Sequence, residues 1–404
     1  MDELVAHRIG GNDFFNNPNI YRFSELIKLK KEKLKGKIEL LDFGIGEPQQ
    51  MPSSSTLLTL ISSSLKEDAN YYSDNGTEYF NNEIIKYMYS EYDVSIENDE
   101  VVHCIGAKSA LSILPLGFIN EGDYVLSTSP GYVVLENMAK WLKGIVYHLP
   151  LMKENNFYPD FSKVEIEILK KTKILYINYP NNPTGQIASK EFYEECIKYA
   201  KKYNFIIVSD AAYLPLTYKK EDRISFLNLD GAKDVGVEVH TLSKGFNMTG
   251  FRIGFVVGNN KIIKVFSCIK ENMDSGQYIP IQHAAIKALN DKRMVNDLIE
   301  KYKRRQYLLQ NILNRFNLKT IDAKAGFYQY VEVPKYIDDL KVESAAEFAH
   351  FLLDKENIFS IPYDDAGSYI RFSLTFKGDS YEEDMEYLEK LYTRLKKYKF
   401  SYWD

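Results

Sequence analysis

Short apolar runs alternate with helix-length segments through the first two thirds of the chain. The segments 106–119 and 190–203 have the length and apolar spacing of helices. Continuous apolar runs bounded by Gly, Asp or Asn are typical of strands that are buried on both faces of a sheet. Alternation of this kind predicts an α/β fold with a mostly parallel seven-stranded sheet sandwiched by helices. The predicted strands are 101–105, 123–127, 144–149, 173–178, 205–210, 237–242 and 252–257.

The pattern changes after residue 262, where long helical segments dominate. These segments, with two β-like runs among them, predict a smaller α+β domain. We assign the polar first 44 residues, with a helical stretch over 23–37, to the same domain. The chain then divides into a large domain, 45–285, and a small domain, 1–44 plus 286–404. The predicted helices after residue 262 are 281–289, 293–316 and 381–397, and the β-like runs are 326–333 and 369–375.

Composition narrows the class of protein. The 404 residues, of which 45% are hydrophobic, suffice for two or three domains with a core that needs no disulfide. Three cysteines form no CxxC pair, which favours the cytoplasm. The 51 basic and 56 acidic residues give a net charge of −5, which argues against nucleic-acid binding. The longest apolar run, near 111–119, contains Pro115 and is too short to span a membrane, and the acidic start lacks the features of a signal peptide.

Three polar motifs follow predicted strands, where loops of a parallel sheet bind ligands. The first is Asn178-Tyr-Pro-Asn-Asn-Pro-Thr-Gly185, and the second is Asp210 with Tyr213 after it. The third is the segment from Thr241 to Gly254, with the sequence Thr-Leu-Ser-Lys-Gly-Phe-Asn-Met-Thr-Gly-Phe-Arg-Ile-Gly. Taken singly, each motif also fits a plain structural role, as a connecting turn, a helix-capping aspartate or a solvated surface lysine.

The third motif combines a lysine with groups that bind anions. A lysine in a desolvated or cationic pocket can lose its proton and attack a carbonyl carbon, which makes Lys244 a candidate nucleophile. Thr241, Ser243 and Arg252 suit a dianionic phosphate, since arginine offers two parallel donors. Only ten of the 51 basic residues are arginine, so an arginine within a motif, such as Arg252, is favoured for a specific role.

The order of these motifs resembles that of the class I/II aminotransferase family, the fold-type I enzymes that use pyridoxal 5′-phosphate (PLP). The similarity extends from Asp42-Phe-Gly-Ile-Gly-Glu-Pro48 to Tyr369-Ile-Arg-Phe-Ser373. Within the family, the segment before Leu26 and the phrase Ser-Lys-Gly-Phe-Asn-Met-Thr-Gly-Phe-Arg resemble the group of LL-diaminopimelate, aspartate and alanine aminotransferases. Two positions depart from the commonest pattern: Ala211 replaces an acid, and Thr241 replaces a serine.

The resemblance implies a role for each matching residue around the cofactor ring. Lys244 would carry PLP as a Schiff base and move the proton of the substrate. Asp210 would pair with the protonated pyridine nitrogen, which keeps the ring an electron sink. Asn182 and Tyr213 would hydrogen-bond the 3′-oxygen, and Tyr132 would stack on the ring.

The resemblance also implies a phosphate site and a substrate site. Backbone amides at a helix start would bind the phosphate, with the side chain of Lys108 left in solvent. Tyr71 would reach the phosphate of a partner subunit, which implies a homodimer. The phosphate residues are Gly106, Ala107, Lys108, Thr241, Ser243 and Arg252, and those for the substrate are Gly46, Asn182 and Arg371.

The implied function is a PLP-dependent aminotransferase that moves an α-amino group between an amino acid and a 2-oxo acid by a ping-pong mechanism. A PLP-dependent oxidase, lyase or decarboxylase on the same fold would keep all of these residues, and a PLP-binding regulatory protein is a further alternative. A metal site is not expected, because the six histidines are scattered without an HExxH motif. For a dicarboxylic donor, Arg22 is the candidate second cation.

Overall fold

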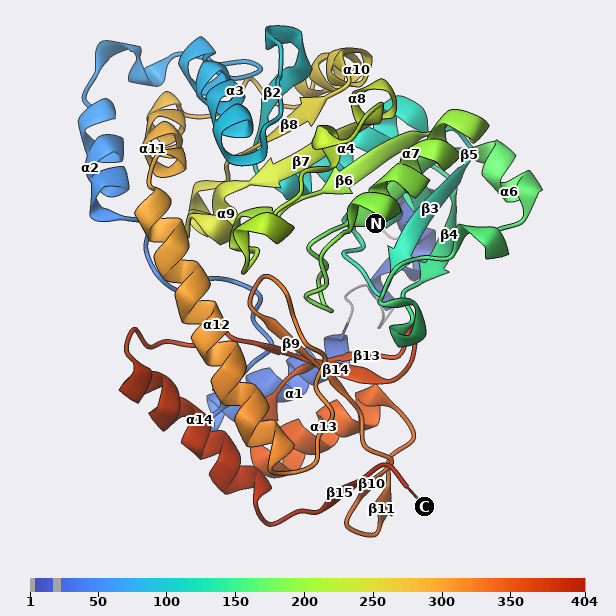
Figure 1. Cartoon of the computed structure of the whole chain (residues 1–404), viewed down its shortest axis with the longest axis vertical. Helices are drawn as coiled ribbons and strands as arrows, with labels where there is room; N and C mark the ends of the chain where they lie inside the picture. Colours follow the sequence, from blue (N-terminus) through green and yellow to red (C-terminus); the bar gives the residue numbers. More distant parts are fainter. Residues whose placement is uncertain (1–3, 17–22, 404) are drawn as a thin grey trace.

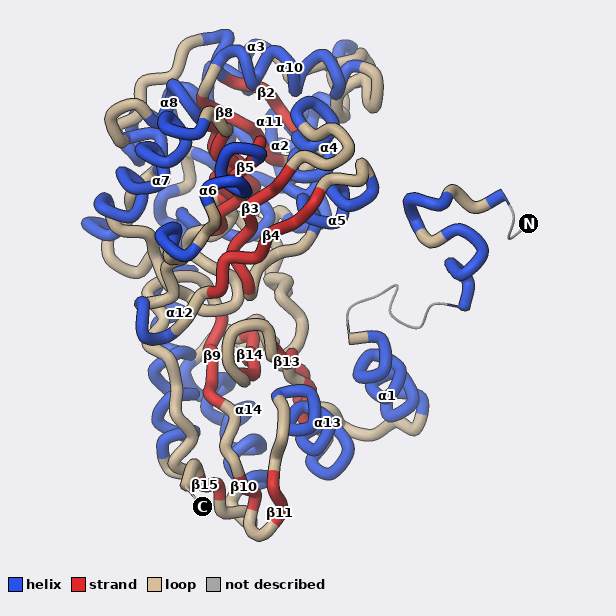
Figure 2. Tube along the Cα trace, turned by 90° about the vertical axis from the view of Figure 1, so that its right-hand side faces the viewer, coloured by secondary structure: helices blue, strands red, loops and turns tan. Residues whose placement is uncertain are grey.

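The computed structural model describes residues 4–16 and 23–403. Figure 1 shows two bodies, one built around a large sheet and the other around smaller sheets, with the long helix α12 (Lys292–Asn314) running from the first to the second. Figure 2, turned by 90°, shows the same division. Within the described residues, no helix combines the length and the apolar character that a membrane span requires.

The seven-stranded sheet has the strand order β2-β8-β7-β6-β5-β3-β4. Strand β8 pairs antiparallel with β2 and β7, and the other pairs are parallel, so the predicted mostly parallel α/β sheet is confirmed. Its strands are β2 (Val101–Cys104), β3 (Tyr124–Ser129), β4 (Ile145–Pro150), β5 (Thr172–Asn178), β6 (Ile206–Asp210), β7 (Gly236–Thr241) and β8 (Gly254–Gly258).

One strand departs from the expected burial. β4 was predicted to be buried on both faces, but among its residues only Leu149 is buried and Ile145 is exposed. The prediction is wrong for this strand, which lies at one edge of the sheet; β2, at the other edge, is buried along its whole length.

Helices cover both faces of the sheet and create two apolar cores. Along β5, Ile174 and Tyr176 belong to one core, whereas Leu175 and Ile177 belong to the other, as the two-residue period of a strand requires. The predicted sandwich is therefore confirmed. The helices of this body are α2 (Ser54–Ser63), α3 (Glu78–Tyr92), α4 (Ala107–Phe118), α5 (Val134–Trp141), α6 (Ile166–Lys171), α7 (Lys190–Tyr203), α8 (Ala232–Val235), α9 (Leu242–Gly245), α10 (Asn260–Glu271) and α11 (Ile279–Leu289).

The second body holds three small sheets. β13 (Ile361–Tyr363), β14 (Tyr369–Ser373) and β9 (Tyr328–Glu332) form an antiparallel sheet, which pairs the two predicted β-like runs. Two-residue strands form the others: β1 (Leu41–Asp42) with β12 (Ile358–Phe359), and β10 (Tyr336–Ile337) between β11 (Leu340–Lys341) and β15 (Phe400–Ser401). The helices are α1 (Ser24–Lys35), α12, α13 (Ala345–Glu356) and α14 (Tyr381–Leu395).

Segments from near the two ends of the chain, α1 and α13, pack against each other in this body. Helices α1 and α13 lie side by side in Figures 1 and 2, and Lys33 Nζ of α1 donates a hydrogen bond to Asp354 O of α13 at 2.8 Å. The parallel pairing of β1 with β12 leads the chain from α1 to the first body alongside β14, and this path positions the segment that contains Gly46.

Candidate active site

A cavity of about 430 Å³ lies between the two bodies, beyond the carboxyl ends of β5, β6 and β7. Its lining unites loops of the large sheet with β9, β13 and β14 of the small sheet. Of the predicted site residues, Gly46, Ala107, Lys108, Tyr132, Asn182, Asp210, Tyr213, Thr241, Ser243, Lys244, Arg252 and Arg371 line this cavity.

Lys244 lies on α9, directly after β7. Its Nζ donates a hydrogen bond to Gly46 O at 2.6 Å. Burial, and then repulsion from the guanidinium of Arg371, lower the pKa of Lys244 from its ordinary value near 10.5 to about 8. About a tenth of this amine is therefore neutral and nucleophilic at pH 7, far more than for a lysine of ordinary pKa.

The lowered pKa of Lys244 predicts its labelling profile. In the cofactor-free protein, the rate at which an amine-reactive reagent modifies Lys244 is expected to rise with pH and to reach half of its maximum near pH 8, because the neutral amine is the reactive form. An exposed lysine should keep gaining reactivity up to about pH 10. Peptide mass spectrometry of protein labelled at a series of pH values measures both, and a half-maximal labelling rate of Lys244 only near pH 10 would contradict the assigned pKa.

Asp210 ends β6 as a buried carboxylate. Its Oδ2 accepts a hydrogen bond from Tyr176 Oη and its Oδ1 accepts one from Ala212 N, both at 3.1 Å. Burial raises the pKa of Asp210 to about 6. Among the described residues no cation lies within ion-pair distance of Asp210. A positively charged group bound in the cavity could therefore pair with this carboxylate without competing with a cation of the protein.

The middle of the cavity is polar and aromatic. Tyr213 Oη and Tyr328 Oη are 2.9 Å apart and share a hydrogen bond. Asn182 Oδ1 accepts a hydrogen bond from Arg371 Nη1 at 2.9 Å, so this asparagine joins the loop after β5 to β14. Tyr132 also lines the cavity. A flat ring with hydrogen-bonding substituents suits this lining.

Hydroxyl and guanidinium groups gather at one end of the cavity. Thr241 Oγ1 donates to Ser243 Oγ at 2.9 Å, and Arg252 Nη1 lies 3.5 Å from Ser243 Oγ. Gly106, at φ 75°, precedes the first turn of α4 and has no side chain to cap it; a Cβ there would lie 2.6 Å from Arg252 Nη2. A helix start beside a guanidinium and two hydroxyls is suited to a phosphate.

At the other end, Arg371 extends from the central strand β14. Its Nη2 donates a hydrogen bond to Gly44 O at 2.9 Å, and its buried Nε has no hydrogen-bond partner in the described part of the chain. Gly46 stands so close to Tyr328 that a Cβ would lie 2.3 Å from the hydroxyl oxygen. An unused donor on a buried guanidinium suits a substrate carboxylate.

Two predicted residues, Gly106 and Tyr71, do not line the cavity. Tyr71 follows α2 and is 67% exposed, away from the lining of the cavity. Arg22 lies outside the described residues. Lys108 is exposed, as predicted, although it borders the cavity.

The prediction missed several lining residues. Tyr328 lies on β9 and Tyr363 on β13, whereas Phe23 precedes α1. None of the three lies in a recognisable sequence motif. Tyr328 and Tyr363 reach the cavity because β9 and β13 pair with β14, and Phe23 reaches it because the segment before α1 lies beside the cavity. The run Gly326-Phe-Tyr328 within a predicted strand was the only local signal. The other missed residues are Gly131, Val133, Asn178, Ala212 and Thr249.

Residues 38–388 match the sequence profile of the family described as aminotransferase class I and II. The chain belongs to this family. It is similar to the LL-diaminopimelate aminotransferase of Methanocaldococcus jannaschii, with 41% identity over 380 residues that cover 93% of this chain and 91% of that relative. The LL-diaminopimelate aminotransferase of Methanococcus maripaludis is 40% identical over 413 residues, which cover 100% and 99% of the two chains.

Solved structures agree with the sequence relatives. The substrate-bound BacF structure from Bacillus subtilis superposes with a TM-score of 0.86 at 28% identity and covers 94% of this chain and 95% of that one. An aminotransferase from Staphylococcus aureus has a TM-score of 0.81 at 30% identity, with 89% and 94% covered. The predicted family, the fold-type I architecture, the PLP cofactor and transamination are thereby confirmed. The chain is an enzyme, which leaves the alternative of a regulatory protein without support.

The residues of the cavity fit PLP. The buried carboxylate of Asp210 lacks a cation, which a protonated pyridine nitrogen would supply. The group of Thr241, Ser243 and Arg252 beside the start of α4 offers donors to a phosphate. Lys244, with its lowered pKa, lies in the same cavity as an amine for the aldehyde carbon.

Proposed function

We propose that the protein exchanges an amino group between LL-diaminopimelate and a 2-oxo acid, by a ping-pong mechanism, in the cavity around Lys244. The observation that carries the site is the convergence of Lys244, Asp210 and Arg371 on one cavity between the two bodies. The substrate is supported by the relatives of 40% and 41% identity, each named LL-diaminopimelate aminotransferase.

The proposed mechanism gives each group of the cavity one task. When bound, PLP supplies an electron sink for negative charge at the substrate Cα. Lys244 Nζ would take the proton from that carbon and return it, a task for which its pKa of about 8 is suited. Asp210 would remain ionised against the ring nitrogen, and Arg371 would bind the α-carboxylate of the substrate. The remaining cofactor contacts would come from Gly106, Ala107, Lys108, Tyr132, Asn182, Tyr213, Thr241, Ser243 and Arg252.

A dicarboxylic substrate needs a second cation. LL-diaminopimelate has a carboxylate at each end, and Arg371 would bind one of them. The lining contains Lys108, Lys244, Arg252 and Arg371, of which the last three already have tasks. We propose that the side chain of Lys108 attracts the distal carboxylate, because it is exposed at the border of the cavity. Arg22, which lies outside the described residues, stays a prediction for this role.

Adding single amino donors to the holoenzyme is expected to single out LL-diaminopimelate. It should bleach the absorbance of the resting cofactor stoichiometrically, and a 2-oxo acid should restore that absorbance. The DD isomer tests stereochemistry, and L-lysine, which lacks the distal carboxylate, tests the second cation. Ammonia release with oxygen uptake would show an oxidase, and carbon dioxide release a decarboxylase. An equal response to L-lysine would contradict the proposed substrate.

We also propose a homodimer in which Tyr71 completes the site of the partner. Exposed apolar side chains gather along α2, the turn after it and the start of α3, and patches of this kind mark interfaces. Tyr71 lies within this segment. Its exposed members are Leu58, Ile61, Leu65, Tyr71, Tyr72 and Tyr79.

Hybrid dimers test this role of Tyr71. Tyr71→Ala and Lys244→Ala homodimers are each expected to be nearly inactive. Unfolding and refolding an equal mixture should restore about one quarter of the sites, because half of the dimers are hybrids and each contains one intact site. Activity that stays at the sum of the two separate variants would contradict a shared site, and a monomer in sedimentation would contradict the dimer.

Two further assignments complete the proposal. The division into a domain of 45–285 and one of 1–44 plus 286–404 is supported by the sheets, since strands β2–β8 lie in the first and all other strands in the second. A cytoplasmic location is supported by Cys104, Cys196 and Cys268, which form no disulfide. Fractionation of cells that express the protein tests the location.

A further inference from the structure

The segment of residues 43–50, here called the strap, connects the two charged groups of the cavity. Three of its consecutive carbonyls, at Phe43, Gly44 and Ile45, accept hydrogen bonds from β14 and the residues after it. Phe43 O accepts from Ser373 N at 2.6 Å, and Gly44 O accepts from Arg371 Nη2 at 2.9 Å. The next carbonyl, Gly46 O, accepts from Lys244 Nζ at 2.6 Å.

Thr375 provides the side-chain contact of the strap that is nearest to Gly46. Its Oγ1 donates a hydrogen bond to Ile45 O at 2.6 Å, and Thr375 is 4% exposed. Because Ile45 and Gly46 are consecutive residues whose carbonyls accept from Thr375 and Lys244, we expect a change at Ile45 to be transmitted to Gly46 and to the amine of Lys244.

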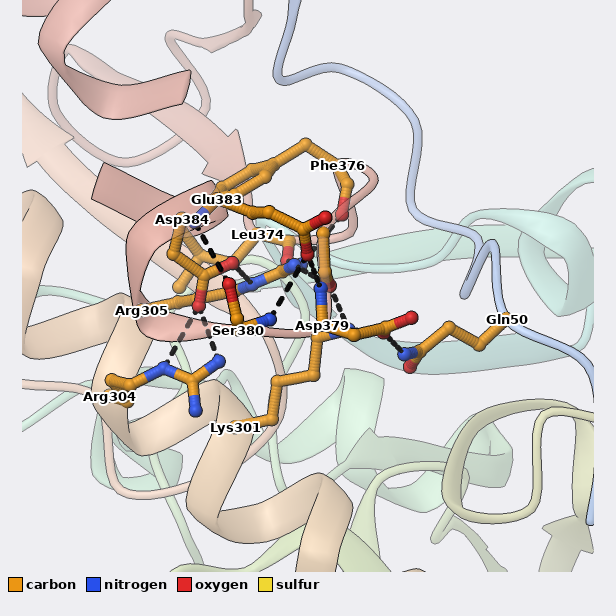
Figure 3. Close-up of polar contacts among 11 residues, drawn as sticks. Gln50, Lys301, Arg304, Arg305, Leu374, Phe376, Asp379, Ser380, Glu383 and Asp384 are labelled. Atoms are coloured by element: carbon orange, nitrogen blue, oxygen red, sulfur yellow. Dashed lines mark hydrogen bonds and ion pairs between the residues drawn. The ribbon is translucent and has the colours of Figure 1, made fainter. Parts of the chain in front are cut away.

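The loop of residues 374–380, which contains Thr375, is itself anchored from α12. Arg305 is 1% exposed, and its guanidinium donates to three carbonyls of this loop. Nη1 donates to Leu374 O at 2.6 Å and to Phe376 O at 2.8 Å, and Nη2 donates to Gly378 O at 2.7 Å. Figure 3 shows these contacts converging on the loop.

A buried ion pair supports the anchor. Arg305 Nε donates to Asp384 Oδ1 at 2.8 Å, and Asp384 Oδ2 accepts from Arg304 Nη2 at 2.6 Å. A buried charge is costly unless it is paired and fully hydrogen-bonded. Since Arg305 makes its three other hydrogen bonds to the backbone of one loop, a different loop conformation would leave buried donors of this guanidinium without partners.

The far end of the loop contacts the far end of the strap. Lys301 Nζ of α12 donates to Gly378 O at 2.5 Å and to Asp379 Oδ1 at 3.0 Å. Glu383 Oε2 accepts from Asp379 N at 2.7 Å. The same Asp379 carboxylate accepts a hydrogen bond from Gln50 Nε2, as Figure 3 shows. The loop therefore holds the strap at both Ile45 and Gln50.

We propose that Thr375 and Asp379 are positioning residues for the reaction: from a loop anchored by Arg305, they hold the strap so that Arg371 and Lys244 are set for the substrate carboxylate and for proton transfer. This inference rests on the proposed role of Arg371. Neither residue lines the cavity, so both act through the strap.

Thr375→Val tests the proposal, because it removes the hydroxyl at nearly constant volume. The probe is an unreactive acid that has the carbon skeleton of the best donor but no amino group. Its dissociation constant, measured by calorimetry with the holoenzyme, is expected to rise about tenfold, which corresponds to the loss of one buried hydrogen bond. The KM of the donor should rise similarly, with kcat lowered less than about threefold. Thr375→Ser, which keeps the hydroxyl, should restore both constants to within about twofold.

Thr172→Val is the matched control. Thr172 is 1% exposed, and its Oγ1 donates to a single carbonyl, Ile168 O, at 2.8 Å, far from the cavity. Both valine variants should lower the melting temperature, but only Thr375→Val should weaken binding of the acid. A lower melting temperature of Thr375→Val with unchanged binding would overturn the proposal.

Substitutions of Gln50 test the second contact. Gln50→Glu places a negative charge against Asp379 and is expected to raise the dissociation constant of the acid about threefold, whereas Gln50→Lys keeps an attractive partner and should match the wild type. Equal binding by both variants would overturn the role of Asp379. Arg371→Lys distinguishes a failure of the proposed function from a failure of this inference. If Arg371→Lys leaves binding of the acid unchanged, the proposed carboxylate site is wrong. If Arg371→Lys weakens binding but the variants of Thr375 and Gln50 do not, only the positioning role is wrong.

Discussion

Replacing Lys244 by alanine is expected to lower kcat by at least about 10,000-fold, because the change removes both the amine that would hold the cofactor and the group that would carry the substrate proton. The amine is prepared for this chemistry, since burial and Arg371 lower its pKa to about 8. A steady-state assay with the best donor of the panel measures the loss, and the absorbance of the protein after dialysis reports whether cofactor is still attached.

The control for Lys244→Ala is Lys233→Ala. Lys233 is also partly buried and donates to Ser95 O at 3.1 Å, but it lies on α8, outside the lining of the cavity. Its loss is expected to affect stability and to leave kcat unchanged. A Lys244→Ala protein that turns over at more than a hundredth of the wild-type rate would contradict the proposed role of this lysine.

Replacing Arg371 by methionine is expected to lower kcat/KM for the amino donor by about 100- to 1,000-fold, as for the loss of two charge-assisted hydrogen bonds to a carboxylate. Methionine preserves much of the apolar volume against the ring of Tyr328, whose centroid lies 4.3 Å from Arg371 Cζ. The change also leaves Asn182 Oδ1 and Gly44 O without their donor.

Arg394→Met separates loss of substrate binding from loss of stability. Arg394 on α14 donates through Nη1 to Glu356 O and Asn357 O, both at 3.0 Å, and does not line the cavity. Both methionine variants should be less stable to heat, but kcat/KM should fall for Arg371→Met alone. If the two variants lose kcat/KM equally, Arg371 acts through the fold rather than through the substrate.

Much of the large sheet could be predicted from local pattern alone. The predicted helix 190–203 has the same bounds as α7, because its amphipathic spacing begins after a capping serine, Ser189, and ends before Asn204 in the left-handed conformation. The pattern of the segment 334–368 predicts no element. It forms α13 and strands of two or three residues, whose pairing depends on partners far along the chain, such as β12 with β1.

The candidate site likewise contains residues that local pattern predicts and residues that only distant contacts bring to it. Asn182, Asp210 and Lys244 follow β5, β6 and β7, which are neighbours in the sheet, so their proximity follows from strand order. Arg371 and Gly46 were named only through a resemblance to a family. Tyr328, Tyr363 and Thr375 were not named at all, since pairing of β14 with distant segments places them at the site or beside it.

The sequence by itself determined the chemical groups of this protein and their order along one sheet, because strands, helix caps and turns depend on neighbouring residues. Only the tertiary structure decided the charge states of Lys244 and Asp210, since a pKa depends on burial and on charges that lie close in space. The contacts of the strap with β14 and with Lys244 also join residues some 200 to 330 positions apart. No local pattern specifies such contacts, because they form only when both bodies have folded and met.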